Sequence, residues 1–217
     1  MDAERLSRVT SMLGEVSARP VLDRFLVLVT ELLSVTAAAV AVIGDGQHQG
    51  AVAVSDPGYA PVDDLQFSLG EGPCLDARRR ARPVLVADLG GADGSWPAFA
   101  SEAIRHGVRA VFAFPLSVGA QSLGVLSLYR DAPGPLEGGD LADAIELSHV
   151  ATHLLLGVQA GLVPGTVPDR LGEILDHRAQ VHQATGMIAA QLETDVATAL
   201  SRLRAHAWSH DRSIDDV

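Results

Sequence analysis

The sequence contains one cysteine, Cys74, and neither lysine nor asparagine. A single thiol cannot form a disulfide within the chain or build a thiolate metal cluster. The first residues carry charges of both signs and no apolar run, so we expect no signal peptide. The longest uninterrupted apolar run, Ala37 to Ile43, is too short to cross a bilayer. We therefore expect a cytoplasmic protein with no membrane partner.

Basic residues are also scarce: 16 Arg stand against 27 Asp and Glu, and the net charge is −11. A chain of this charge has no general attraction for nucleic acid or for an anionic membrane. Any contact with nucleic acid must therefore come from a local patch. Hydrophobic residues make up 47% of the chain and charged residues 20%, proportions that allow a buried core and argue against disorder.

Signatures of common enzyme classes are missing. The sequence has neither the Gly-x-Ser-x-Gly motif of a serine nucleophile nor the Gly-Lys-Ser/Thr end of a phosphate-binding loop. The pairs His149/His153 and His206/His210 have the helical spacing of two metal ligands, but no third ligand is in register with either pair. We therefore predict a protein that is not an enzyme, with no catalytic residues, no metal site and no cofactor beyond an unidentified small-molecule ligand.

Hydrophobic spacing predicts a mixed fold. Apolar residues three and four apart indicate one helix around residues 6–16 and another that ends near residue 34. Residues 55–72 are rich in Pro and Gly and are predicted to be mostly loop. Further strands are predicted at 37–43, 50–54, 83–87, 108–116 and 122–129, and further helices at 73–80, 96–106 and 140–159. This order predicts an α+β fold, an antiparallel sheet with helices on one face.

The composition changes after residue 160. Residues 161–168 are rich in Gly and Pro and indicate a linker, after which the pattern is helical throughout. We therefore expect two domains, 1–160 and 169–217, joined by this linker. Ser213 and the acidic residues after it are typical of the start of a third helix, so we expect the second domain to be incomplete.

The most distinctive short motif is Gly70-Glu71-Gly72-Pro73-Cys74. The two glycines allow backbone angles that are closed to other residues, and Pro73 suits the first turn of a helix. Cys74 would then lie in a helix N-terminal turn, where the dipole lowers a thiol pKa and attracts anions. This cysteine could contact a ligand or respond to oxidation, or it could be a small buried core residue.

Five of the nine aromatic residues are predicted around one loop-rich face of the sheet, where they could line an apolar pocket for a small molecule. For Phe112 and Phe114, which lie on predicted strands, an ordinary core position explains the residue equally well. The predicted ligand-binding residues are Phe67, Cys74, Trp96, Phe99 and Phe114.

Four segments of the first 160 residues match a known pattern: Leu65 to Ala77, Arg82-Pro83-Val84, Trp96-Pro97-Ala98-Phe99 and Phe114-Pro115-Leu116. With these segments the chain resembles a GAF domain, a small-molecule sensor fold. Together they are similar to the GAF half of actinobacterial GAF–ANTAR regulators. The resemblance implies that this half senses a small molecule or a redox signal.

The last fifth of the chain is Ala-rich and helical, with the segments Gln183 to Met187, Ala199 to Trp208 and Asp211 to Val217. These segments resemble the ANTAR module, a helical RNA-binding output domain of bacterial antiterminators. The resemblance implies that eight residues contact RNA: Gln183, Thr185, Gly186, Met187, Arg204, Ala207, Trp208 and Arg212.

The electrostatics of this segment are poor for RNA. Thr185 stands where the family usually has Lys, and residues 169–217 hold five Arg against eight Asp and Glu, a net charge of −3. Met187 and Trp208 could equally be packing residues, because apolar residues at helical spacing usually are.

The two resemblances together imply a signal-responsive RNA-binding regulator of transcription antitermination, whose partner is a double-hairpin leader RNA. Near-heptad spacing from Leu171 to Leu192 indicates a homodimer built on parallel helices, whose pairing a bound ligand would shift. The alternative is a ligand-sensing or dimerisation module whose helical tail binds a protein and has no role in RNA binding. The acidic tail and Thr185 favour that alternative.

Overall fold

The computed structural model describes residues 21–44, 47–91, 94–159, 168–210 and 212–217. Its centre is a sheet of five antiparallel strands in the order β2-β1-β5-β4-β3. The strands are β1 (Ala37–Gly44), β2 (Gln47–Val54), β3 (Val84–Val86), β4 (Ala110–Val118) and β5 (Gln121–Arg130). The five strands predicted from the sequence are therefore confirmed, with ends that differ by a few residues. The helix predicted around residues 6–16 and most of the predicted linker lie outside the described residues.

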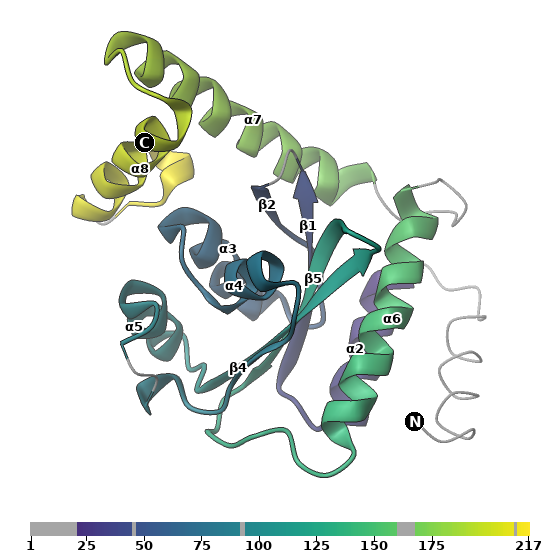
Figure 1. Ribbon diagram of the computed structural model, residues 1–217. Coiled ribbons are helices and arrows are strands. Elements are labelled where there is room, and N and C mark those ends of the chain that lie inside the picture. Colours follow the sequence, from purple (N-terminus) through teal and green to yellow (C-terminus); the bar gives the residue numbers. More distant parts are fainter. Residues whose placement is uncertain (1–20, 45–46, 92–93, 160–167, 211) are drawn as a thin grey trace.

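Two helices, α2 (Val21–Leu33) and α6 (Asp140–Gln159), cover one face of the sheet (Figure 1). Successive side chains of a strand point to opposite faces, so Ala38 and Val40 of β1 pack toward these helices. Within the described part of the chain, one helix, α6 from Asp140 to Val158, is long and apolar enough to cross a membrane by length and composition. One face of α6 is buried in the core and packs against β4, and this packing explains why the helix is apolar.

The other face of the sheet carries α3 (Ala60–Leu69), α4 (Pro73–Arg80) and α5 (Pro97–Arg105) (Figure 1). The expectation of helices on a single face is therefore wrong. The strands are apolar on both sides: Phe112 and Phe114 of β4 face α2 and α6, while Val111 and Ala113 face α3 to α5. A sheet with two apolar faces has to be covered on both.

The helix α3 was not expected, because residues 55–72 were predicted to be mostly loop. A short 3-10 turn at Pro57–Tyr59 leads into it, and Pro61 lies in its first turn, where the missing N–H of proline costs nothing. Gly70 ends the helix in the left-handed conformation at φ 71°. The Pro and Gly residues of this segment thus mark the ends of a helix.

The C-terminal residues form α7 (Pro168–Gln191), α8 (Val196–Ser209) and a 3-10 turn at Ile214–Asp216. We call α7 and α8 together the C-terminal hairpin. Figure 1 shows it at the upper left, and it packs against β2 and α3. Its buried core consists of Val181, Leu200, Leu203, Ala207 and Ile214, together with Phe67 of α3. The hairpin therefore shares a small core with the sheet-containing part of the chain.

Candidate functional site

Five polar side chains are buried together between β5 and the helices α3 and α4. We call them the buried polar cluster: Asp63, Gln66, Cys74, Ser127 and Tyr129, each 0% exposed. Ser127 and Tyr129 are two residues apart on β5 and so point to the same face of the sheet. Asp63 and Gln66 are three apart on α3 and lie on one side of that helix. Two local periodicities therefore bring the polar groups to one place.

Gln66 and Cys74 bond each other twice. The amide Nε2 of Gln66 donates to the Cys74 Sγ at 2.9 Å, and the Cys74 backbone N–H donates to the Gln66 Oε1 at 2.8 Å. The Ser127 Oγ lies 3.0 Å from the same sulfur atom, within hydrogen-bond distance. The first N–H groups of a helix have no partner within it, so Gln66 caps α4 from outside, where Gly72 offers no side chain. These bonds join α3, α4 and β5.

The surroundings of the cluster raise the pKa of the Tyr129 hydroxyl and of the Cys74 thiol. The Tyr129 hydroxyl donates to the Asp63 Oδ1 at 3.1 Å. Burial, followed by the charge of Asp63 and then that of Cys74, raises the pKa of Tyr129 well above its ordinary value. Burial and then Asp63 raise the pKa of the Cys74 thiol to about 12. The sequence argument that a helix N-terminus lowers this thiol pKa is therefore wrong, because burial outweighs the dipole. Such a thiol does not respond readily to oxidants.

The turn between α3 and α4 also reaches α5. The carboxylate Oε1 of Glu71 accepts from the backbone N–H groups of Ala98 and Phe99 at 2.9 and 3.0 Å. The N-cap residue of α5, Trp96, is in the left-handed conformation at φ 52° and makes no capping bond with its side chain. Glu71 therefore supplies the cap and places a negative charge at the positive end of α5. Trp96, rather than Ser, Thr, Asp or Asn, stands immediately before Pro97, and this was a sequence signal for such an outside cap.

The structure brings only some of the predicted ligand-binding residues together. Phe99 is buried and Trp96 half-buried in one apolar cluster on the face that α3, α4 and α5 cover, and Cys74 lies on the same face. Phe67 packs instead with the C-terminal hairpin. Phe114 lies on the opposite face beneath α2 and α6, because the alternation of β4 turns it that way. The five residues therefore do not line one pocket in this structure.

Sequence reasoning missed the other members of the cluster, Asp63, Gln66, Ser127 and Tyr129. One signal was available in β5, where Ser127 and Tyr129 alternate with Leu126 and Leu128. This alternation predicts a face of the strand that carries polar groups. No comparable signal marks Asp63 and Gln66, which lie in the segment predicted to be loop.

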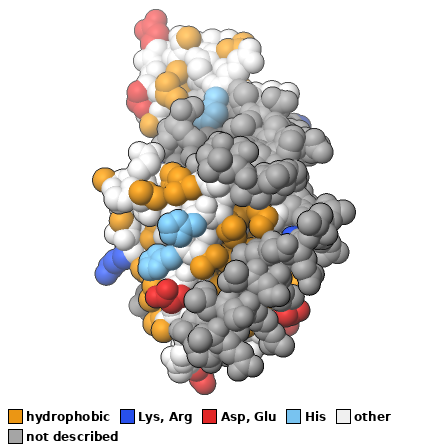
Figure 2. Space-filling view, turned by 90° about the vertical axis from the view of Figure 1, so that its right-hand side faces the viewer, with side chains coloured by type: hydrophobic (Ala, Val, Ile, Leu, Met, Phe, Trp, Pro, Cys, Tyr) orange, Lys and Arg blue, Asp and Glu red, His pale blue; other side chains and the backbone are white. Residues whose placement is uncertain are grey.

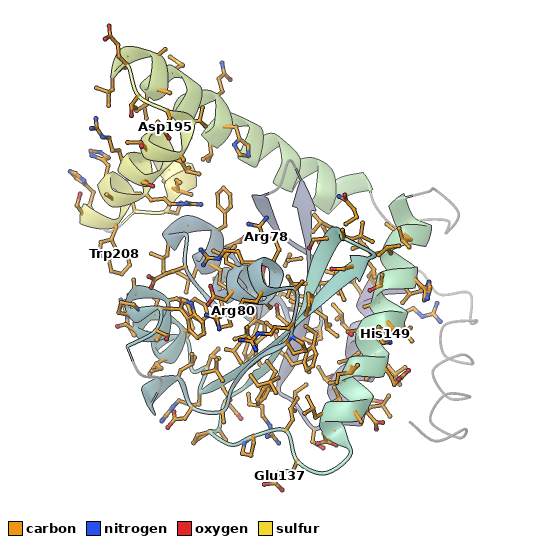
Figure 3. All side chains as sticks on the ribbon, in the orientation of Figure 1. Arg78, Arg80, Glu137, His149, Asp195 and Trp208 are labelled. Atoms are coloured by element: carbon orange, nitrogen blue, oxygen red, sulfur yellow. The ribbon has the colours of Figure 1, made fainter. Side chains whose placement is uncertain are left out.

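The predicted RNA-binding residues divide into two groups. Thr185 is buried and donates its hydroxyl to the Val181 carbonyl at 2.7 Å, Ala207 is buried, and Arg204 is half-buried against Phe67. The others are exposed: Gln183, Gly186, Met187, Trp208 and Arg212. Figure 3 shows Trp208 projecting from its end of α8.

The densest basic run, residues 78–80, lies on α4 (Figure 3). Arg79 and Arg80 both bond the carboxylate of Asp76, at 2.7 and 2.6 Å. Asp76 is buried and the two arginines are exposed, so the pairs are partly buried, and they neutralise part of the run. In the described part of the chain, no three His, Cys, Asp or Glu side chains gather in a way that could hold a metal ion.

Comparisons with known proteins agree with the fold described above. The family model for the GAF domain matches residues 16–155, well over half of the chain. None of the curated proteins compared with the chain matches it.

Three solved structures illustrate the similarity of fold. A GAF domain from a phosphoenolpyruvate-protein phosphotransferase of Coxiella burnetii is 17% identical with a TM-score of 0.56, over 73% of this chain and 94% of that one. The free methionine-R-sulfoxide reductase of Neisseria meningitidis, solved with its substrate, is 15% identical with a TM-score of 0.54, over 73% and 90%. The GAF domain of the cyanobacteriochrome TePixJ is 18% identical with a TM-score of 0.52, over 68% and 94%. At these identities the likeness concerns the fold alone.

Proposed function

Because the chain belongs to the GAF domain family, we propose that it is a signal-responsive regulator in which the sheet-containing part binds a small molecule and thereby controls the C-terminal hairpin. The proposed division follows the sequence: a sensor at 1–160, a linker at 161–168 and an output segment at 169–217. The observation that supports a sensor role for the sheet-containing part is the buried polar cluster. Burying polar groups costs free energy unless each is bonded. These five bond one another, and on an otherwise apolar face they are the polar groups that a ligand could bind.

The chemistry of the cluster indicates the kind of ligand. A carboxyl, an amide and two hydroxyl groups offer both donors and acceptors, and the neighbouring Trp96 and Phe99 offer apolar surface. We infer a small polar molecule with one flat or apolar part. Its entry would separate α3 and α4 from β5, because the cluster's hydrogen bonds now join these elements. The buried thiol of Cys74 favours ligand binding over redox sensing as the signal.

For the output we propose RNA binding by the exposed side of the hairpin. The proposal rests on the ANTAR resemblance and on the exposure of Gln183, Met187, Trp208 and Arg212. Trp208 is 52% exposed and could stack on an unpaired base, while Arg212 offers a phosphate contact. Arg204 and Ala207 are engaged within the chain, and Arg204 belongs to this surface only when the hairpin leaves α3.

A second candidate partner is a protein, and a specific observation favours it. Four large apolar side chains on the hairpin are between 49% and 57% exposed: Met187, Leu192, Val196 and Trp208. Apolar surface on an acidic helical segment suits a protein partner better than a polyanion. The two candidates predict opposite results with nucleic acid.

Filter binding of the whole chain to a double-hairpin leader RNA, at about 50 mM salt, tests the RNA proposal. We expect saturable binding that weakens as salt rises, and a loss of at least about tenfold in the double variant Trp208→Ala, Arg212→Ala. Arg105→Ala is the matched control, because it removes the same charge from the exposed surface of α5 and breaks only a pair with Glu102. Absence of binding by the wild-type chain would favour the protein partner. Native mass spectrometry of the same sample shows whether a small molecule copurifies.

The predicted homodimer needs an exposed apolar surface on which two copies can pair. Part of the near-heptad seam on α7 is used within the chain, since Val181 and Ile188 pack against α8. On α6, however, Ile145 and Leu156 are 37% and 36% exposed, with His149 exposed between them. Figure 2 shows hydrophobic side chains beside histidines on the side of the molecule that includes α6. We propose that two copies pair along this side.

Charge on α6 should separate the copies. We expect the double variant Ile145→Asp, Leu156→Asp to have the mass of a monomer by light scattering, at concentrations where the wild-type chain is dimeric, because two buried carboxylates cannot be paired there. Val118→Asp is the control for a single added carboxylate, at a residue that is 51% exposed near the β4–β5 turn. A wild-type chain that is monomeric throughout, or a double variant that stays dimeric, contradicts this surface.

A further inference from the structure

Arg204 of α8 lies on the last turn of α3. Its Nε donates to the backbone carbonyl of Phe67 at 3.1 Å, and its Cζ lies 5.6 Å from the centre of the Phe67 ring. The last carbonyl groups of a helix have no partner within it and form the negative end of its dipole, so a guanidinium bonds well there. The half-buried arginine thus joins the hairpin to the sensor by a charged hydrogen bond and a cation–π contact.

The backbone under Arg204 is fitted to it. A Cβ atom at Gly70 would come within 2.7 Å of the Arg204 Nη1, so any side chain at this position would push the guanidinium away. Leu200 and Leu203, on the neighbouring turns of α8, pack with the Phe67 side chain. The contact is therefore the polar part of an otherwise apolar interface.

The segment that receives Arg204 also reaches the interior of the sensor. We call Phe67 to Gly72 the α3–α4 turn. Glu71 within it caps α5, and Gln66 just before it bonds Cys74 in the buried polar cluster. A Cβ at Gly72 would lie 2.6 Å from the Cγ of Gln66, so the turn and the cluster are packed directly together. A shift of α3 or α4 must therefore move the carbonyl and the ring that Arg204 contacts.

We propose that Arg204 and the α3–α4 turn form a latch, which keeps the hairpin docked while the buried polar cluster is closed and releases it when the turn moves. This device goes beyond the proposed function, because it needs neither RNA nor an identified ligand. One consequence does rest on the proposed function: a partner that binds Arg204 competes with docking. Two discrete arrangements of one interface are a common basis of coupling between sites.

Hydrogen exchange of the whole chain, followed by mass spectrometry, tests the latch. We expect Arg204→Ala to raise exchange in α8 and in the last turns of α7 about ten- to a hundredfold, because the docked state loses its charged bond. Arg202→Ala is the matched control: the same residue type, two positions earlier on α8 and exposed. It should change exchange less than about twofold. Peptides from β5, at the centre of the sheet, serve as the internal reference for global unfolding.

A second variant tests whether a change in the α3–α4 turn reaches α8. Glu71→Ala removes the cap of α5 at the far side of the turn from Phe67. We expect exchange in peptides covering 200–207 to rise at least about threefold, with β5 unchanged. Equal α8 exchange in Arg204→Ala and Arg202→Ala would overturn the latch. So would Glu71→Ala loosening α5 while leaving α8 protected. Neither readout involves RNA or a ligand, so failure of the RNA proposal leaves this test unaffected.

Discussion

Replacing Gly72 with alanine should lower the free energy of unfolding by about 3 kcal/mol or more. Gly72 has φ 143°, a conformation that side chains rarely adopt. The added Cβ would also meet the side chain of Gln66, at 2.6 Å from Cγ and 2.9 Å from Cδ. Gln66 cannot move aside cheaply, because both ends of its amide are bonded to Cys74. Urea unfolding followed by circular dichroism gives the free energy.

The control for this variant separates strain from packing. Gly107 also has a positive φ, 84°, but a Cβ there would have nothing within 4 Å. Gly107→Ala should therefore cost only about 1 kcal/mol, the price of the backbone conformation. If Gly72→Ala costs no more than Gly107→Ala, the packing of the turn against the buried polar cluster contributes nothing to stability.

Cys74 should be almost inert in the folded chain. With a pKa of about 12, the thiolate fraction at pH 8 is about 10⁻⁴, so we expect labelling by a disulfide reagent at least about a thousandfold slower than in guanidinium. The residue is also 0% exposed, which adds a barrier of access. The unfolded chain is the internal control, because it holds the same single thiol. Labelling of the folded chain at a comparable rate would contradict both the burial and the raised pKa.

The same pKa makes stability depend on alkaline pH. An unfolded thiol with a pKa near 9 loses its proton where the folded thiol, with a pKa of about 12, still holds it. The unfolded state therefore binds fewer protons between these values, and stability falls as pH rises, by up to about 1.4 kcal/mol per pH unit. Below about pH 9 the thiol keeps its proton in both states, so Cys74 adds no pH dependence to stability there. Tyr129 acts in the same direction, since its pKa is raised as well. Cys74→Ala should remove the thiol's share of the slope and keep most of the Tyr129 share, because burial and Asp63 raise the pKa of Tyr129 more than Cys74 does.

The sheet could be predicted from the sequence because its signal is local. The runs that became β4 and β5 are long and apolar, and the turn between them is marked by Gly119. The two faces of β4 could not be assigned so easily. A run that is apolar throughout carries no alternation, so nothing local showed that Phe114 turns toward α2 and α6 rather than toward a pocket.

The candidate site depends on distant pairs, which local patterns do not reveal. Cys74 meets Ser127 across 53 positions and Asp63 meets Tyr129 across 66. The ANTAR resemblance implies that Arg204 contacts RNA, yet in the structure it bonds a backbone carbonyl 137 positions away. A carbonyl group is common to every residue and leaves no trace in the sequence. The Gly-Glu-Gly-Pro-Cys motif did mark the site. Its two glycines lie where the side chains of Arg204 and Gln66 come close to the backbone.

The strand order has a consequence for synthesis of the chain. The central strand, β5, ends at Arg130, and it pairs with β1 on one side and β4 on the other. While the ribosome is still making residues before β5, β1 can pair only with β2, and its other edge is open. An unpaired apolar edge invites association with other chains. The sheet can therefore be completed only after β5 has been synthesised. Slowed translation just before residue 121 should increase the need of the nascent chain for chaperones.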